Sequence, residues 1–252
     1  MRERLYRTEG LILRRSDLGE ADRLLLIATP EGKRRVIAKG VRKTTSKLAG
    51  HLELFTHTAL QLAVGRNLDL ITQSQTLNNH ATLRTSLSRL SCAYYTAELY
   101  DRFTEEDDEN RALFNLLVEI MGLLDQTRNP DLALRSYELS LLNLVGYRPQ
   151  LQTCTLCGAL LTEDANRFCP SLGGVVCPQE RVPGSDVITM SNPTFRLLRY
   201  LQTQPLHVVE SLRLSVQVRS EAAHLLRSYL RRLLERDLRS VAFLDEVLYH
   251  DE

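Results

Sequence analysis

The segment "CTLCGALLTEDANRFCPSLGGVVC" holds four of the chain's five cysteines. Thiolates bind Zn²⁺ tetrahedrally, and a C-x-x-C pair supplies two of them from one tight turn. Cys154 and Cys157 form such a pair, and Gly158 lets the backbone fold around a metal. An odd number of cysteines with four clustered favours metal ligation over a disulfide framework. We therefore predict one structural Zn²⁺, with Cys154, Cys157, Cys169 and Cys177 as its ligands.

The second half of this site leaves alternatives open. A hairpin with its turn at positions 172 and 173 would place Cys169 opposite Val176, and a one-residue bulge would bring Cys169 to Cys177. Glu180 competes with Cys169 as the fourth ligand, because it stands three residues after Cys177 and carboxylates also bind zinc. The simplest alternative is four free thiols without metal. A catalytic zinc is disfavoured, since the H-x-E and P-C-x-x-C arrangement of zinc deaminases is missing.

The first third of the chain is basic. Residues 1–79 carry 14 Lys and Arg against 8 Asp and Glu, whereas residues 80–150 carry 7 against 11. The run from position 33 to position 47 contains no acidic residue, and such a run suits phosphate oxygens. Taken alone, this basic run is as consistent with a solvated surface as with nucleic-acid binding. The predicted nucleic-acid surface consists of Arg14, Arg15, Lys33, Arg34, Arg35, Lys39, Arg42, Lys43 and Arg66.

Only Tyr6 and Phe55 are aromatic in this third. Few aromatic side chains are therefore available for base stacking, and we expect electrostatic binding that tolerates any nucleotide sequence.

Short runs rich in Leu, Ile, Val and Thr predict five strands within residues 1–79, separated by turn signals. No helix-length segment lies between them, so a small barrel is favoured over a βαβ sheet. Helical periodicity follows, including "RALFNLLVEIMGLLDQ" and a last long helix with an apolar stripe from Ala222 to Leu234. The fold class is α+β. We expect a barrel domain at 1–79, a helical domain at 80–150 and 183–252, and a zinc-binding insertion at 151–182.

Five arginines lie along the last helix beside its apolar stripe: Arg227, Arg231, Arg232, Arg236 and Arg239. Their simplest role is a solvated face, with Glu235 and Asp237 as partners. Alternatively, Arg227 and Arg231 bind a partner, an acidic peptide with a hydrophobic end. No P-loop or dinucleotide fingerprint is present, so nucleotide hydrolysis is disfavoured. No apolar run is long enough for a membrane span, and we expect a cytoplasmic protein without catalytic residues.

Five segments of the chain occur together in one order: "TEGLILRRSDLGEADRLLLIATPEGKRRVIAKGVRK", "LAGHLELFTHTALQLAVGRNLDLITQSQ", "LLNLVGYRPQLQTCTLCG", "LGGVVCP" and "LRSVAFL". With this combination the chain resembles the RecO family of bacterial DNA repair proteins. The resemblance implies an N-terminal OB barrel, a helical domain and a zinc-binding insertion. It also implies a non-enzymatic recombination mediator of the bacterial nucleoid. Such a protein binds single- and double-stranded DNA, anneals strands coated by single-strand-binding protein, and promotes RecA loading with RecR.

The resemblance further implies that the helical domain receives the acidic C-terminal tail of single-strand-binding protein. Zinc-bearing relatives have C-x-x-C twice, and here Glu180 stands at the fourth ligand position. Two other functions stay open. One is a zinc-ribbon factor that binds nucleic acid or polymerase without annealing, although residues 151–182 contain only Arg167 and Arg181 as cations. The other is a zinc hydrolase.

Overall fold

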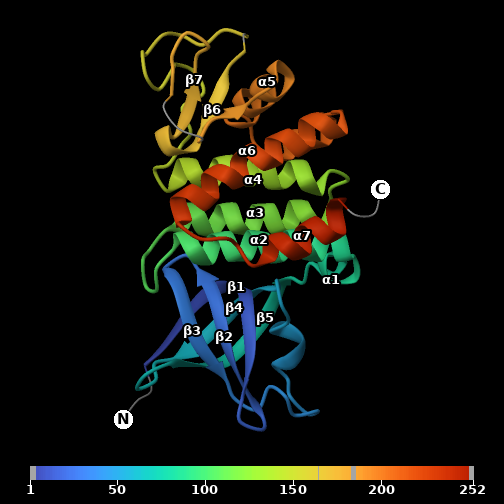
Figure 1. The fold of residues 1–252 in the computed structure, drawn as a ribbon. Helices are drawn as coiled ribbons and strands as arrows, with labels where there is room; N and C mark the ends of the chain where they lie inside the picture. The colour runs from blue at the N-terminus through green and yellow to red at the C-terminus, as the bar shows by residue number, and fades with distance from the viewer. Residues whose placement is uncertain (1–3, 164, 183–185, 250–252) are drawn as a thin grey trace. The chain divides into compact units, whose positions relative to one another are not determined.

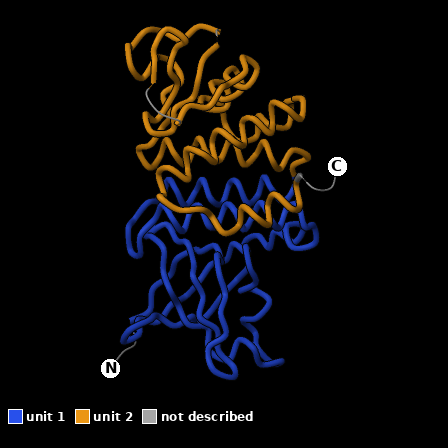
Figure 2. The backbone as a smooth tube through the Cα atoms, viewed as in Figure 1, with its two compact units in different colours: residues 1–126 blue, residues 127–252 orange. Residues whose placement is uncertain are grey.

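The computed structural model describes residues 4–163, 165–182 and 186–249. The chain divides into two compact units, residues 1–126 and 127–252 (Figure 2). The first unit thus contains the barrel together with the three helices that follow it. The domain boundaries expected from the sequence, at residues 79, 150 and 182, remain predictions.

The first unit begins with a closed five-stranded barrel (Figure 1). Its strands are β1 (Leu5–Leu18), β2 (Asp22–Thr29), β3 (Gly32–Ala38), β4 (His57–Ala63) and β5 (Asp69–Asn78). They neighbour one another in the order β1-β2-β3-β5-β4, and β4 pairs with β1 to close the barrel. Only β3 and β5 are parallel. The five predicted strands and the α+β class with an OB-like barrel are confirmed.

Alternation along the strands separates the barrel core from its outer face. Leu25 and Ile27 of β2 and Val36 of β3 point inward and are fully buried. On β2, Leu26 and Ala28 have the outward parity, yet they are buried as well. Helix α3 contacts β2, so part of the outer face of the barrel is covered within the first unit.

Three helices complete the first unit: α1 (Ala81–Thr85), α2 (Leu87–Phe103) and α3 (Arg111–Gln126). The bounds of α3 are those of the predicted helix "RALFNLLVEIMGLLDQ". The segment Thr104–Glu109, which we call the acidic loop, connects α2 to the start of α3 and contains five consecutive Asp and Glu residues.

The second unit combines helices with a small sheet. Its helices are α4 (Pro130–Leu144), α5 (Asn192–Leu201), α6 (Val216–Leu234) and α7 (Ser240–Tyr249), with 3-10 turns at Pro170–Leu172 and Leu206–Ser211. Its strands β6 (Arg167–Cys169), β7 (Gly174–Val176) and β8 (Ile188–Thr189) form a sheet in the order β7-β6-β8. No helix in the described part of the chain is both long and apolar enough to cross a bilayer.

The end of the last long helix differs from the prediction. Helix α6 stops at Leu234, because Glu235 adopts a left-handed conformation with φ of 53°. Arg236 and Arg239, which were expected along that helix, therefore lie beyond it, and a separate helix α7 follows. A left-handed residue commonly ends a helix but is usually Gly or Asn, so Glu235 gives no signal in the sequence.

Candidate nucleic-acid interface and metal centre

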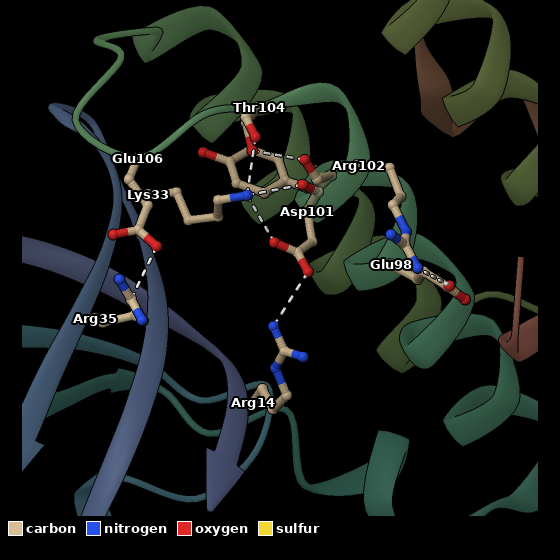
Figure 3. A network of polar contacts seen from close by, with 9 residues as sticks. Arg14, Lys33, Arg35, Glu98, Asp101, Arg102, Thr104 and Glu106 are labelled. Atoms are coloured by element: carbon tan, nitrogen blue, oxygen red, sulfur yellow. Dashed lines mark hydrogen bonds and ion pairs between the residues drawn. The ribbon is translucent and has the colours of Figure 1, made fainter. Parts of the chain in front are cut away.

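Lys33 is buried at the end of helix α2 (Figure 3). Its Nζ donates to the Asp101 carbonyl at 2.8 Å, to Asp101 Oδ1 at 2.7 Å and to the Thr104 carbonyl at 2.8 Å. All three donor positions of the ammonium group are thereby used. The positive charge stands at the C-terminus of α2, where the helix dipole and the unpaired carbonyls favour a cation. Lys33 therefore acts as a helix cap within the first unit, and this contact leaves it no free donor for a phosphate.

The acidic loop pairs with the next two residues of β3. Arg34 NH1 lies 3.3 Å from Asp107 Oδ1, and Arg35 Nε lies 2.9 Å from Glu106 Oε1 (Figure 3 for Arg35). Arg34 has the inward parity of β3, and its guanidinium also lies 5.8 Å from the centre of the Tyr6 ring. Arg35 points outward. The charges of both arginines are therefore matched by carboxylates of the same unit.

The remaining predicted cations fall into two groups. Three have acidic partners nearby: Arg14 with Asp101, Arg15 with Glu53 and Arg42 with Asp17. The other three, Lys39, Lys43 and Arg66, are exposed and form no ion pair with any described residue.

A loop after β3 carries Lys39, Arg42 and Lys43 and is attached to the turn between β1 and β2. The Arg42 amide donates to the Ala21 carbonyl at 2.9 Å, and the Gly40 amide donates to Asp22 Oδ1 at 2.7 Å. These contacts hold three cations at one end of the barrel. Arg66 lies in a different turn, between β4 and β5.

Three of the four clustered cysteines meet in the second unit. The Sγ atoms of Cys154, Cys157 and Cys177 all lie within 4.8 Å of one another. The Gly158 amide donates to the Cys154 carbonyl at 2.9 Å, and Gly158 has a φ of 74°, so this glycine turns the C-x-x-C segment as predicted. The Cys177 amide donates to Cys154 Sγ at 3.4 Å.

The surroundings of Cys154 favour a thiolate. Burial raises the pKa of this thiol, but the amides of Cys157, Cys177 and Leu156 donate to the sulfur and bring the pKa down to about 7. Cys157 shows the opposite result: the Ala159 amide lowers its pKa, but the neighbouring Cys154 sulfur and burial raise it to about 11. Of these two sulfurs, Cys154 therefore carries a negative charge more readily. Such a donor set fits a soft cation such as Zn²⁺.

Cys169 lies outside this group, and the expected hairpin register is wrong. Cys169 pairs with Gly174 instead of Val176, because the connection, residues 170–173 with a 3-10 turn, is centred one residue earlier than the expected two-residue turn. Cys177 then falls level with Asn166, three residues or about 10 Å along the strand from Cys169. Cys169 Sγ faces Ser171 Oγ at 3.3 Å.

Glu180 belongs to the turn that follows Cys177. Its amide donates to the Cys177 carbonyl at 3.4 Å. Arg167 binds this turn from β6, donating to the carbonyls of Cys177, at 3.1 Å, and of Glu180. The carboxylate of Glu180 is not among the three converging ligand atoms.

The comparisons with known proteins agree along almost the whole chain. The family profile described as "Recombination protein O N terminal" matches residues 1–80, and "Recombination protein O C terminal" matches residues 84–242. The DNA repair protein RecO of Roseiflexus sp. (strain RS-1) is 54% identical over 247 residues, which cover 98% of this chain and 87% of the relative. The chain belongs to the RecO family. The RecO protein of Nocardioides sp. (strain ATCC BAA-499 / JS614) is 39% identical over 96% of this chain and 99% of the relative. That of Dehalococcoides mccartyi (strain ATCC BAA-2266 / KCTC 15142 / 195) is 35% identical over 96% of this chain and 96% of the relative.

This RecO chain also has a cavity of about 580 Å³ between α6 and α7. Ala223, Leu238 and Val241 contribute apolar surface to it, while Arg227 and Arg231 are among its cations. Arg227 binds Asp245 of α7, and Arg231, whose side chain is 65% exposed, lies 4.0 Å from Asp237.

Sequence reasoning missed the acidic partners in this RecO barrel unit. Asp101 lies in α2, and Glu106 and Asp107 lie in the acidic loop; no local pattern in the sequence predicted that these three bind Arg14 of β1 and Lys33, Arg34 and Arg35 of β3. The available signal was the change from net positive charge in residues 1–79 to net negative charge in residues 80–150.

Proposed function

We propose that this chain is a recombination mediator in DNA repair that works without catalytic residues. It binds single- and double-stranded DNA, anneals complementary strands coated with single-strand-binding protein, and promotes RecA loading together with RecR. Membership of the RecO family supports the repair role. The observation that carries DNA binding is the exposure of Lys39 and Lys43, without ion pairs among the described residues, on a loop of an OB-like barrel.

The mechanism is charge neutralisation. Two complementary strands repel each other through their phosphates, and cations that contact both backbones lower that repulsion. Lysine binds phosphate as a mobile point charge, which suits strands of any sequence. Lys33 is left out of this surface because its ammonium group caps α2.

A triple charge reversal, K39E/K43E/R66E, tests this proposal. We expect annealing to be lost, and the log–log salt slope for single-stranded DNA to become shallower by about 2, since each phosphate contact contributes about 0.7. The matched control is R128E/R181E/R213E, which reverses three exposed arginines of the second unit. Annealing that survives in the barrel variant but not in the control would place the DNA surface in the second unit.

The tail of single-strand-binding protein is the partner that we propose for the cavity between α6 and α7. Its apolar lining suits the hydrophobic end of the tail, and the arginines suit its acidic residues. Arg231 is the better candidate of the two predicted residues, because Arg227 is held by Asp245. R231E should weaken binding of a tail peptide, whereas R128E should not. Equal binding by wild type and R231E would refute this assignment.

The second unit holds, we propose, one structural Zn²⁺ through Cys154, Cys157 and Cys177. The ion would crosslink the C-x-x-C turn to the end of the hairpin. Glu180 is the better fourth ligand, because it follows Cys177 at the interval at which Cys157 follows Cys154. X-ray absorption of the zinc-loaded protein should show three sulfurs and one oxygen. Four sulfurs, with one lost in C169S, would restore Cys169 as the ligand.

A further inference from the structure

The acidic loop places two carboxylates on arginines of β3. Glu106 and Asp107 bind Arg35 and Arg34, two members of the predicted nucleic-acid surface. Their carboxylates present oxygen atoms to the guanidinium groups, as phosphates do. The loop thus offers the barrel an internal substitute for a nucleic-acid backbone.

The backbone of the acidic loop is firmly attached to the barrel. The Asp107 amide donates to the Lys33 carbonyl at 3.1 Å, and Glu106 forms a parallel bridge with Lys33. A Cβ atom on Gly32 would meet the Asp108 amide nitrogen at 2.7 Å, so the two backbones are in direct contact. Strand β3 pairs with β5 only at Val36 and Ile37, and the loop uses part of the edge that β5 leaves open.

The side chains of this contact are far less constrained than the backbone. The side chain of Glu106 is 45% exposed, that of Asp107 is 69% exposed and that of Arg35 is 53% exposed. Ion pairs at such exposure hold weakly, because water and salt screen them. A rotamer change is enough to release Arg35, without moving the loop backbone. A DNA strand that brings several phosphates also gains from the release of its counterions.

We propose that the acidic loop is an intramolecular competitor for DNA phosphates at Arg34 and Arg35. The carboxylates of Glu106 and Asp107 occupy these arginines until a strand already bound at Lys39 and its neighbours supplies phosphates at high local concentration. The loop therefore selects long polyanions over isolated phosphates and short strands. This inference rests on the proposed DNA binding by the barrel.

The test compares two pairs of substitutions with equal charge change. E106Q/D107N neutralises the competing carboxylates, and Asn tolerates the left-handed conformation of Asp107, whose φ is 60°. E105Q/E109Q is the matched control, because these exposed residues form no ion pair with any described residue. Both pairs are also made in an R34Q/R35Q background. Binding of a fluorescent oligothymidylate is measured over a salt series, and thermal melting confirms that each variant folds.

E106Q/D107N should tighten binding about fivefold relative to the control pair, since Arg35 loses its ion pair with Glu106 and Arg34 loses the shorter of its two, keeping only Asp69 at 4.0 Å. For an oligothymidylate too short to displace the loop in wild type, the log–log salt slope should steepen by about 1.4, for two further phosphate contacts. Both effects should vanish in the R34Q/R35Q background. If the two pairs act equally, or if the slope stays constant while wild type still binds, the competition is refuted and the proposed DNA binding stands. If neither wild type nor E106Q/D107N binds, both proposals fail.

Discussion

Lys33 offers the sharpest separation between a structural and a DNA-binding role. Its substitution K33A would remove the ammonium group that caps α2 and leave the Asp101 carboxylate and two carbonyls without that donor. Removing one partner of a buried ion pair costs about 3–5 kcal/mol. The Asp101 side chain is 27% exposed, so water replaces part of the lost contact. We therefore expect a loss at the low end, about 3 kcal/mol.

The matched control is K39A, which replaces the residue that directly follows β3. Lys39 is exposed and forms no ion pair with the described residues, so its loss should leave stability within about 0.5 kcal/mol. The two variants should then separate: K33A destabilises the fold and keeps the DNA affinity of the folded protein, whereas K39A keeps the fold and weakens DNA binding.

Thermal melting and DNA titration decide the matter. A loss of about 3 kcal/mol lowers Tm by about 6–12 °C for a chain of this size. DNA binding is measured well below the Tm of K33A, so that unfolding does not reduce the apparent affinity. A K33A protein with unchanged Tm and weakened DNA binding would refute the capping role and return Lys33 to the nucleic-acid surface.

Three further predictions concern other parts of the chain. E221Q should lower the free energy of unfolding by about 1.5–3 kcal/mol, because the Glu221 carboxylate accepts hydrogen bonds from the Ser191 amide and from the Ser191 and Thr194 hydroxyls. Denaturant unfolding measures this loss, and E246Q, at an exposed position on α7, is the control. Burial lowers the pKa of His80, and the hydrogen bond to the Phe55 carbonyl raises it by a smaller amount. The unfolded chain therefore binds more protons below pH 6.5, and the stability of the fold falls as the pH drops. H80N should flatten the dependence of Tm on pH between about 7.5 and 5.5. A chelator that removes zinc, or the substitution C177S, should lower the melting temperature of the second unit. C169S should have little effect on zinc content, whereas C177S should lower it. Equal zinc loss in both variants would contradict the three-sulfur site.

Local signals in the sequence were enough for the barrel and for helices such as α3. Turn residues such as Gly32 and Gly40 have positive φ in the structure, and they bound the predicted strand between them. Helix α3 has the predicted bounds because its apolar residues recur at helical spacing between a polar loop and Gln126. Each of these features depends on neighbours within a few positions, which is the range that a sequence pattern reports.

The metal centre was predictable only in part, because its second half depends on strand register. Cys154 and Cys157 are fixed by a single turn. Cys169 and Cys177 are related through a hairpin, and a shift of its turn by one residue changes each pairing partner by two positions and moves Cys169 away from the site. The signal in "CPSLGG" was Pro170, because proline favours the first position of a helical turn and ends a strand.

Charge asymmetry along a sequence does not by itself give charge asymmetry on a surface. The basic barrel segment and the acidic segment after it fold into one unit, and Asp101, Glu106 and Asp107 bind four of the nine predicted DNA-binding residues. The partner of Lys33 stands 68 positions later in the chain, beyond the reach of any local pattern. What remains for a polyanion is therefore smaller than the basic run suggests, and it is concentrated on the loop with Lys39 and Lys43. Variants of that loop, rather than of β3, should control the first contact with DNA.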